Sequence, residues 1–221
     1  MKLFAAGNHL QTMNVVLFGA SGMIGRRILK ELLTREHGVE SVVRHPEKLK
    51  SEPGDQVRVG DILNPESVAE TATGMDAAIS AYAPPQDDQA KLLDATRSLI
   101  EGLKKAGVRR LLMVGGAGSL EVSPGVQLID TPSFPAAWKS IAEKHREALD
   151  ILKASDLDWT SFSPAAFIEP GERTGKFRVG TDQLIVDEKG ESRISAEDYA
   201  VALVDELEKS EHVKARFTVG Y

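Results

Sequence analysis

The sequence predicts an α/β fold with a doubly wound, mostly parallel sheet in a single domain. Short continuous apolar runs, of which residues 15–18 are the first, alternate with longer stretches of helical periodicity. Such runs are typical of parallel strands that helices cover on both faces. The first run enters a helix through Gly19, Gly22 and Gly25. No linker rich in Gly, Pro or Ser divides the 221 residues, so one domain is expected.

The expected elements follow one another along the chain. After the first strand, further strands are expected at 39–43, 56–60, 76–81, 109–116, 157–163 and 215–221. The clearest helices are expected at about 87–106, at about 136–154 and within 194–210. In the first of these, Leu92, Leu99 and Leu103 recur at helical spacing. Ser195 followed by Asp198 resembles a capping box at a helix start.

Composition excludes several classes of site. The net charge is −6 and the basic residues are scattered, which argues against binding of nucleic acid or an anionic membrane. No apolar run is long enough to span a membrane. The absence of cysteine excludes a disulfide framework and a cysteine nucleophile, and it favours a cytoplasmic location. The five histidines lack metal-ligand spacing, so no metal site is expected.

Residues 1–12 are expected to form a disordered N-terminal extension. They are too short and too weakly apolar for a signal peptide, and a second methionine, Met13, stands directly before the first strand. A functional arm is the alternative. The folded domain is therefore expected to span 13–221, with a substrate-pocket segment at about 165–197.

The three glycines suit a turn that binds a phosphate group. A helix start presents unpaired backbone N–H groups and the positive end of the helix dipole. Glycine lets the backbone turn tightly, approach a pyrophosphate and pack helix against strand. The spacing Gly-x-x-Gly-x-x-Gly differs from the common G-x-G-x-x-G pattern, and a plain connector is the alternative. At the start of an alternating α/β pattern, we expect the turn to bind a dinucleotide.

Arg44, at the end of the second expected strand, favours NADP(H), with NAD(H) as the other possibility. An acidic residue at this place would bind the NAD ribose, whereas a guanidinium can grip the 2′-phosphate of NADP. No carboxylate follows that strand before Glu47, and His45 is positioned to assist. The alternative is that Arg44 is an ordinary solvated surface residue.

Several short motifs together resemble a known family. They are "FGASGMIG", "VVRHPEKL", "VGDI", "ISAY", "VGGAGSL", "LDWTSFSP" and "GERTGKFRVG". In this combination they resemble the atypical short-chain dehydrogenase/reductases, which are NAD(P)-binding Rossmann proteins. The resemblance is greatest to the group of small bacterial NADH-flavin reductase-like proteins, and biliverdin reductase B and the NmrA-like proteins are more distant. It covers about residues 13–221.

The resemblance implies cofactor contacts at the expected carboxyl ends of the strands. The pyrophosphate would contact Gly19, Ser21, Gly22, Met23, Ile24 and Gly25, and the 2′-phosphate would contact Arg44. The adenine would lie against Asp61 and Ile62, and the ribose and nicotinamide would lie against Ser80, Ala81 and Tyr82. The nicotinamide would be covered by Pro164, Ala165, Ala166 and Phe167. Ligands bind open sheets of this kind at that edge. For Asp61, a helix cap before residues 63–67 is the alternative.

The usual catalytic pair of short-chain reductases is missing from this sequence. That pair is Tyr-x-x-x-Lys on the helix after the fifth strand, where lysine lowers the pKa of the tyrosine. Neither Tyr82 nor Tyr199 has lysine four residues later, and Tyr221 ends the chain. Alcohol–ketone chemistry is therefore disfavoured, whereas flavins and quinones can take their proton from water.

Four residues remain as candidates for the reaction site. Ser119 and Tyr82 are candidate catalytic hydroxyls, and Phe134 and Trp138 are candidates to stack on a flat substrate. For Ser119 the alternative is a plain loop hydroxyl, and for the aromatic residues it is packing.

Two functions of different classes are compatible with these features. The first is an NAD(P)H-dependent oxidoreductase, preferring NADPH, that reduces a small planar acceptor such as a flavin or quinone. The second is an NADP-binding sensor or regulator with little catalysis, as in the NmrA-like proteins. An epimerase or dehydratase is a weaker third, because such enzymes usually keep the tyrosine. The expected partner is a small-molecule substrate, and the expected state is a monomer or a dimer.

Overall fold

The computed structural model describes residues 12–49 and 52–221, so the predicted disorder of the N-terminal extension falls almost entirely outside the described residues. Its main sheet has the strand order β10-β12-β8-β5-β4-β1-β2-β3. These strands are β1 (Asn14–Phe18), β2 (Gly38–Val43), β3 (Asp55–Val59), β4 (Ala77–Ser80), β5 (Arg110–Val114), β8 (Asp158–Ser163), β10 (Arg178–Gly180) and β12 (Ala215–Gly220). Only β10 runs antiparallel to its neighbour in this sheet, which confirms the predicted mostly parallel α/β fold.

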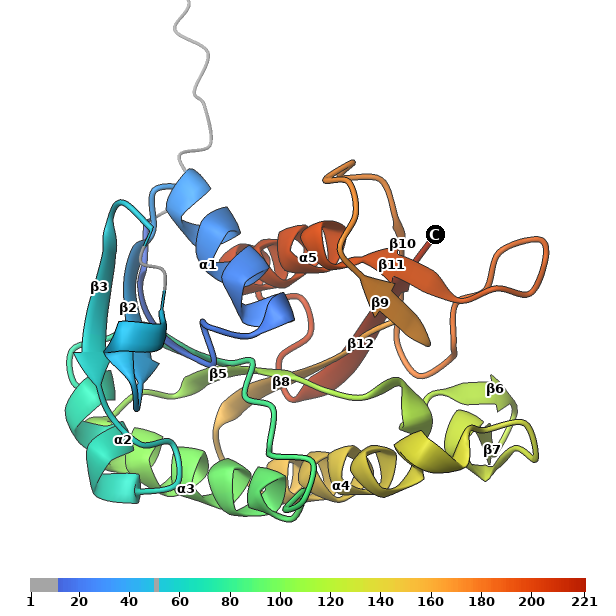
Figure 1. Ribbon diagram of the computed structural model, residues 1–221, viewed down its shortest axis with the longest axis horizontal. Coiled ribbons are helices and arrows are strands. Elements are labelled where there is room, and N and C mark those ends of the chain that lie inside the picture. Colours follow the sequence, from blue (N-terminus) through green and yellow to red (C-terminus); the bar gives the residue numbers. More distant parts are fainter. Residues whose placement is uncertain (1–11, 50–51) are drawn as a thin grey trace, which may run out of the picture.

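Helices cover both faces of the sheet, as predicted for a doubly wound fold (Figure 1). One face packs against α1 (Met23–Thr34) and α5 (Ala196–Lys209), and the other against α2 (Pro65–Ala72), α3 (Lys91–Ala106) and α4 (Ala136–Lys153). The side chains of β1 alternate between the two faces of the sheet. Val15 and Leu17 pack in the core beneath α1 and α5, and Val16 and Phe18 pack in the core beneath α2, α3 and α4. All four side chains are fully buried or nearly so, which explains the continuous apolar run.

The chain reverses its direction across the sheet between β1 and β4. The first three strands run outward in the order β1, β2 and β3, and the chain then returns to place β4 on the other side of β1. Phe18, the last residue of β1, pairs in register with Val42 and Ser80. The carboxyl ends of the three central strands therefore lie at one edge, at a topological switch point where open α/β sheets bind ligands.

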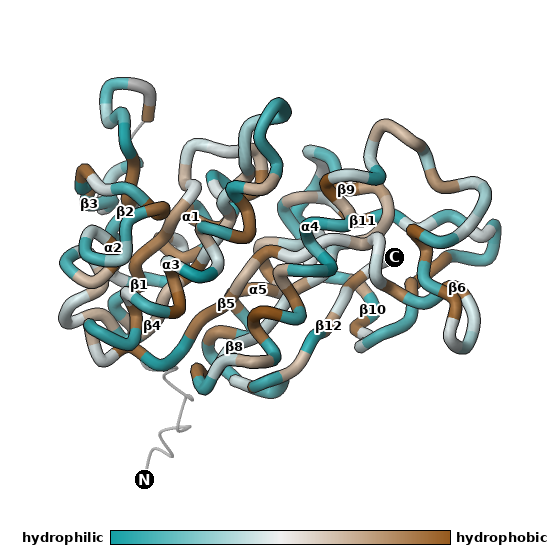
Figure 2. The backbone as a smooth tube through the Cα atoms, turned by 90° about the horizontal axis from the view of Figure 1, so that it is seen from below, coloured by the Kyte–Doolittle hydropathy of each residue, from teal (hydrophilic) through white to brown (hydrophobic). Residues whose placement is uncertain are grey.

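Several short elements are absent from the sequence prediction. They are the strands β6 (Glu121–Ser123), β7 (Val126–Gln127), β9 (Phe167–Glu169) and β11 (Arg193–Ser195), and the 3-10 turns η1 (Pro46–Lys48), η2 (Ala117–Ser119) and η3 (Leu128–Asp130). Strand β9 pairs with β11, and β6 pairs with β7. Both views place β6, β9, β10 and β11 at the end opposite to β2 and β3 (Figures 1 and 2). Two- and three-residue strands carry too short a pattern to be recognised from sequence.

The predicted cap of the last helix is half formed. The hydroxyl of Ser195 accepts a hydrogen bond from the backbone N–H of Asp198 at 3.0 Å, as in a capping box. The carboxylate of Asp198 does not complete the box. It accepts instead from the backbone N–H groups of Thr174 and Gly175 and from the hydroxyl of Tyr221, and so fixes the loop before β10 to α5.

Tyr199 is a core residue. Its ring stacks on Phe162 with the ring centres 3.9 Å apart, and Phe162 stacks in turn on Phe217. The hydroxyl of Tyr199 donates a hydrogen bond to the backbone carbonyl of Phe162 at 2.6 Å. Full burial raises the pKa of Tyr199 well above its usual value. This tyrosine therefore joins β8, β12 and α5 within the core.

A buried ion pair joins β5 to α5. The guanidinium of Arg110 lies 2.7 Å from the carboxylate of Glu206, and both side chains are almost fully buried. Burial lowers the pKa of Arg110, and the neighbouring Glu206 opposes that shift. His212 donates its backbone N–H to the same carboxylate.

No helix among the described residues meets the length and hydropathy required to cross a bilayer.

We predict that Glu206→Gln lowers the free energy of unfolding by about 3 kcal/mol, because it leaves a buried guanidinium without a counter-charge. Urea unfolding followed by circular dichroism measures this loss. Glu101→Gln, which breaks an exposed pair with Lys105, is the matched control and should leave the midpoint almost unchanged. Equal effects of the two substitutions would contradict the prediction.

Candidate functional site

Two adjoining cavities open at the carboxyl ends of β1, β4 and β5. The larger has a volume of about 730 Å³ and the smaller one of about 340 Å³. They share a wall formed by Gly22 and by residues 81–83, which follow β4. Together they form one elongated site over the switch point of the sheet, which is the place the sequence predicts for a dinucleotide.

The smaller cavity lies over the glycine turn and the end of β2. It is lined by Phe18, Gly19, Ser21, Gly22, Val42, Val43, Arg44, His45, Gly60, Ile62, Ala81, Tyr82 and Ala83. Its walls bring together the turn after β1 and the turn after β2, which are 25 residues apart in sequence when counted from Gly19 to Arg44. In addition to the shared residues Ala81 and Tyr82, five predicted cofactor residues line this cavity: the turn residues 19, 21 and 22, together with Arg44 and Ile62.

Gly19 and Gly25 are required by close backbone packing. Gly19 has a φ of +88°, and a Cβ there would overlap the carbonyl oxygen of Ala81. A Cβ on Gly25 would overlap the carbonyl oxygen of Gly19 itself. The first turn of α1 therefore lies directly on the end of β1, and both positions exclude any side chain.

Gly22 differs from its two neighbours in the motif because its Cβ position is open. Its φ of −73° and ψ of 169° suit any residue, and an added Cβ would meet only the carbonyl oxygen of Gly19 at 3.4 Å. No side chain among the described residues caps α1, and its first turn has no acidic residue. The turn thus leaves a space beside the helix start that a side chain would fill and a phosphate would fit.

Arg44 is exposed at the rim of the smaller cavity, beside His45. Among the residues of the described part of the chain, it has no salt-bridge partner. Glu40 on the same strand is buried and paired with Arg58, so it does not neutralise the rim. The guanidinium is free to contact a phosphate group.

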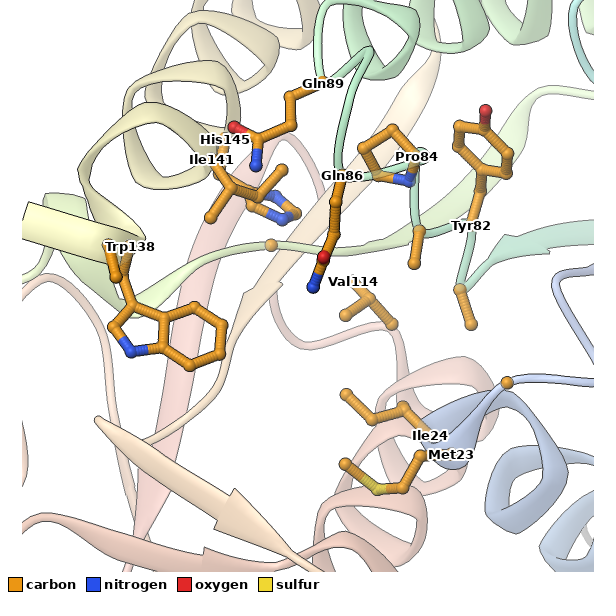
Figure 3. A pocket seen from close by; sticks show the side chains of 15 residues that line it. Met23, Ile24, Tyr82, Pro84, Gln86, Gln89, Val114, Trp138, Ile141 and His145 are labelled. Atoms are coloured by element: carbon orange, nitrogen blue, oxygen red, sulfur yellow. The ribbon is translucent and has the colours of Figure 1, made fainter.

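The larger cavity is mainly apolar and continues from the glycine turn toward α4. Its walls are formed by Gly22, Met23, Ile24, Ala81, Tyr82, Ala83, Pro84, Gln86, Gln89, Val114, Gly115, Ala137, Trp138, Ile141 and His145. Figure 3 shows Met23, Ile24 and Val114 facing Trp138 and Ile141 across the space, with the amide of Gln86 projecting between them. The side chain of Trp138 is 64% exposed, as expected of a ring at a cavity mouth.

His145 is a site residue that the sequence analysis missed. It lies four residues after Ile141 on α4, and both residues line the larger cavity, so one face of this helix forms part of the cavity wall. Burial lowers the pKa of His145 to about 4, so the ring is neutral at neutral pH. The i, i+4 spacing on the helix after the fifth strand is the spacing of the absent Tyr-x-x-x-Lys pair, and it was the signal that could have identified His145.

Tyr82 lines both cavities, but its hydroxyl is poorly placed for catalysis. The ring points away from Met23 and Val114, with the hydroxyl at its far end (Figure 3). The hydroxyl oxygen is buried and has no hydrogen-bond partner among the described residues. Burial raises the pKa of Tyr82, which makes the phenol a weaker acid. Its catalytic role therefore stays a prediction that the geometry does not favour, whereas its ring does form part of the site wall.

The catalytic role predicted for Ser119 stays a prediction that the geometry does not favour. Ser119 is buried and lines neither cavity. Its hydroxyl accepts a hydrogen bond from Arg216 at 2.8 Å, and its backbone carbonyl accepts another from the same guanidinium. The 3-10 turn after β5 directs this side chain toward β12, so its role is to fix that turn.

Phe134 is half-buried and also lines neither cavity.

Several predicted cofactor residues lie behind the cavity walls. Gly25 and Ser80 are buried and act through packing. The carboxylate of Asp61 accepts a hydrogen bond from the backbone N–H of Leu63 at 3.0 Å. The helix cap considered as its alternative is supplied by Asn64, which accepts from the N–H groups of the first turn of α2.

The segment at about 165–197 contributes no residue to either cavity wall among the described residues, so its role as a substrate-pocket segment stays a prediction. Pro164 and Ala165 are buried, and Ala165 belongs to the core beneath α1 and α5. Ala166 and Phe167 hydrogen-bond through their backbones to Ser192, where β9 joins β11. That pairing draws the chain away from the switch point, so the closure of residues 164–167 over a nicotinamide stays a prediction.

Comparison with known proteins decides the family. A family model described as NAD(P)H-binding matches residues 19–210, which include the glycine turn, Arg44 and most of the larger cavity. This chain belongs to the NAD(P)H-binding family. Its fold and relatives are those of NAD(P)-binding Rossmann proteins of the atypical short-chain dehydrogenase/reductase type, as the sequence motifs indicate.

Proteins with similar sequences cover nearly the whole chain. An uncharacterised Bacillus subtilis protein, YwnB, is 42% identical over 94% of this chain and 98% of its own length. A solved Bacteroides thetaiotaomicron structure named "putative epimerase" is 44% identical, with a TM-score of 0.89 over 96% of this chain and 98% of that one. A Streptococcus pneumoniae structure named "putative NADH-flavin reductase" is 34% identical, with a TM-score of 0.85 over 94% and 99%. These similar proteins therefore share the fold of this chain over nearly its full length.

We predict that Gly22→Val abolishes NADPH binding while the thermal midpoint of the ligand-free protein stays nearly unchanged. The valine side chain would fill the space beside the helix start, and the backbone there tolerates it. Titration of NADPH by its fluorescence and a thermal melt measure the two effects. Gly25→Ala is the contrasting variant, expected to lower the midpoint because its methyl group meets the Gly19 carbonyl. Unchanged affinity in Gly22→Val would make the turn a mere connector.

Proposed function

We propose that this protein is an NADPH-dependent reductase of a small planar acceptor. The observation that carries the proposal is the continuity of the two cavities through Gly22 and residues 81–83. One cavity offers a glycine turn and a free guanidinium, and the other offers flat apolar walls with Trp138 at its mouth. A dinucleotide bound along the first would bring its reactive end to the second.

Arg44 supports a preference for NADPH over NADH. A guanidinium can hold the 2′-phosphate with two charge-assisted hydrogen bonds, and no acidic side chain lines the smaller cavity to repel that phosphate. His45 on the same rim is a second possible contact. The adenosine end of the cofactor is thus expected between the ends of β2 and β3.

The residues of the larger cavity would orient the acceptor and exclude water. A bound NADPH supplies a hydride, and the chain needs to hold an electron-poor ring against it. Met23, Ile24, Val114 and Ile141 provide apolar walls, and the exposed indole of Trp138 can stack on a flat ring. Since the tyrosines lack the reductase pattern, the proton of the reduced acceptor comes from solvent.

A cofactor-binding sensor with little turnover is the main alternative. The larger cavity favours the reductase, because a sensor needs no second chamber of this size beside its cofactor. We extend the proposal to a cytoplasmic protein that is monomeric or dimeric. The test is NADPH oxidation by the pure protein against flavins, quinones and ketones. Tight NADPH binding without oxidation by any acceptor would favour the sensor.

We predict that the wild type binds NADPH more tightly than NADH, and that Arg44→Glu narrows the ratio of the two affinities by about 10- to 100-fold. The new carboxylate would repel the 2′-phosphate. Parallel titrations of both cofactors measure the ratio. Arg97→Glu, an equal charge change at an exposed site on α3, should leave it unchanged. Equal affinities in the wild type would contradict a role for Arg44.

We predict that Tyr82→Phe and Ser119→Ala each slow hydride transfer by less than about tenfold, whereas loss of a general acid costs roughly 10²–10⁴-fold. Neither hydroxyl faces the larger cavity, and that of Ser119 is bound to Arg216. Stopped-flow oxidation of NADPH isolates the chemical step from product release. A loss of general-acid size in either variant, with NADPH affinity intact, would instead indicate a carbonyl reductase with a displaced acid.

A further inference from the structure

We propose that the acceptor is an uncharged planar ring bearing a carbonyl group, such as a quinone, and that His145 donates a hydrogen bond to that carbonyl. This inference rests on the reductase function proposed above and specifies its substrate. Two properties of the larger cavity lead to it: the kinds of side chain in its wall, and the placement of the histidine ring.

The wall of the larger cavity contains no Asp, Glu, Lys or Arg among the described residues that line it. The contrast with the smaller cavity is direct, since that one has Arg44 at its rim. An anionic group moved into such a wall would lose its hydration without gaining a counter-charge, which is costly. A phosphate, sulfonate or carboxylate on the acceptor would therefore weaken its binding, whereas an uncharged ring meets matching surfaces.

The polar groups of this cavity are those that hydrogen-bond a neutral carbonyl ring. His145 has no hydrogen-bond partner among the described residues, and its Nδ1 atom is buried. The Gly116 backbone packs against the Cβ, Cγ and Cδ2 side of the ring, since a Cβ there would lie only 2.8–3.2 Å from these atoms. Of the two ring nitrogens, Nδ1 is the buried one and neither is among the atoms that Gly116 approaches, so we assign the donor to Nε2.

Gln89 adds a second unpartnered polar group in the same wall. Its Oε1 atom is buried and has no partner among the described residues. The amide of Gln86 projects into the space opposite Met23 and Ile24 (Figure 3). Of these two side chains, the amide of Gln86 is the one that reaches the space, and it can both donate to and accept from a ligand.

A neutral imidazole in this position stabilises the charge that hydride addition creates. It carries one N–H, which can donate to the carbonyl oxygen as electron density moves onto that atom. In the balanced reaction, one hydrogen reaches the quinone as hydride from NADPH, and the other as a proton from solvent, to give the hydroquinone and NADP⁺. His145 is unchanged at the end, because it donates a hydrogen bond and transfers no proton.

The test compares 1,4-naphthoquinone with its 2-sulfonate, which adds an anionic group to the same ring system. We expect the wild type to reduce the uncharged quinone with a kcat/KM at least about tenfold higher, after correction for the reaction of each quinone with free NADPH. Gln86→Lys adds a cation to the wall and should narrow or reverse this preference. Equal use of both quinones by the wild type, or a preference that Gln86→Lys leaves unchanged, would overturn the proposed acceptor class.

The role of His145 is tested with two substitutions and a binding measurement. His145→Phe keeps a flat ring against Gly116 but removes the donor, and it should lower kcat/KM for naphthoquinone about 10- to 100-fold. His145→Gln keeps a donor and should recover part of that loss. In the protein loaded with NADP⁺, which cannot turn over, naphthoquinone should shift the imidazole NMR signals of His145. Unchanged kinetics in His145→Phe, or signals that do not respond to the quinone, would overturn the role.

These outcomes are separable from failure of the proposed function. NADPH affinity should be the same in the wild type and His145→Phe, because the smaller cavity is untouched. A protein that binds NADPH but oxidises it with no acceptor refutes the reductase function itself. A protein that reduces quinones while ignoring acceptor charge and the loss of His145 retains the function and refutes this inference.

Discussion

The site depends on the contact between the first turn of α1 and the end of β1. Gly25 lies against the carbonyl oxygen of Gly19, and Gly19 lies against the carbonyl oxygen of Ala81. These approaches exclude side chains and bring the ends of β1, β4 and α1 to one point. Gly22 occupies the remaining opening, where a side chain would fit and no other group of the described residues fills the space. The opening at Gly22 that this packing leaves is suited to a phosphate group.

The chemistry of the site is divided between its two cavities. The smaller holds the free guanidinium of Arg44, so it suits a polyanion, and the larger has apolar and neutral polar walls. A dinucleotide contains both kinds of group, since its charged phosphates join two flat rings. Arg110 and Glu206 form a buried ion pair that lies outside both cavities and holds α5 to the sheet. They support the site from behind without entering it.

The fold could be predicted because its signals are local. The apolar runs of the parallel strands and the glycine turn specify their own structures within a few residues, and the observed strand ends differ from the expected ones by at most two positions. Residues 164–167 and Ser119, which the sequence predicts at the site, do not line the cavities, and the reason is different. Ser119 is held by Arg216, 97 residues away, and β9 is held by β11, and neither partnership leaves a local pattern.

The sequence by itself determined the sheet, its helices, the phosphate-binding turn and the basic residue after β2, because each depends on hydrophobic period or on spacing along the chain. Only the tertiary structure decided which side chains face the ligand. It brought Ile141 and His145 of α4 into the wall opposite Met23 and Ile24, and it turned the hydroxyls of Tyr82 and Ser119 away. The physical reason is that a helix fixes only the relative directions of its side chains, whereas the packing of α4 against α3 and the sheet fixes which direction leads to the cavity.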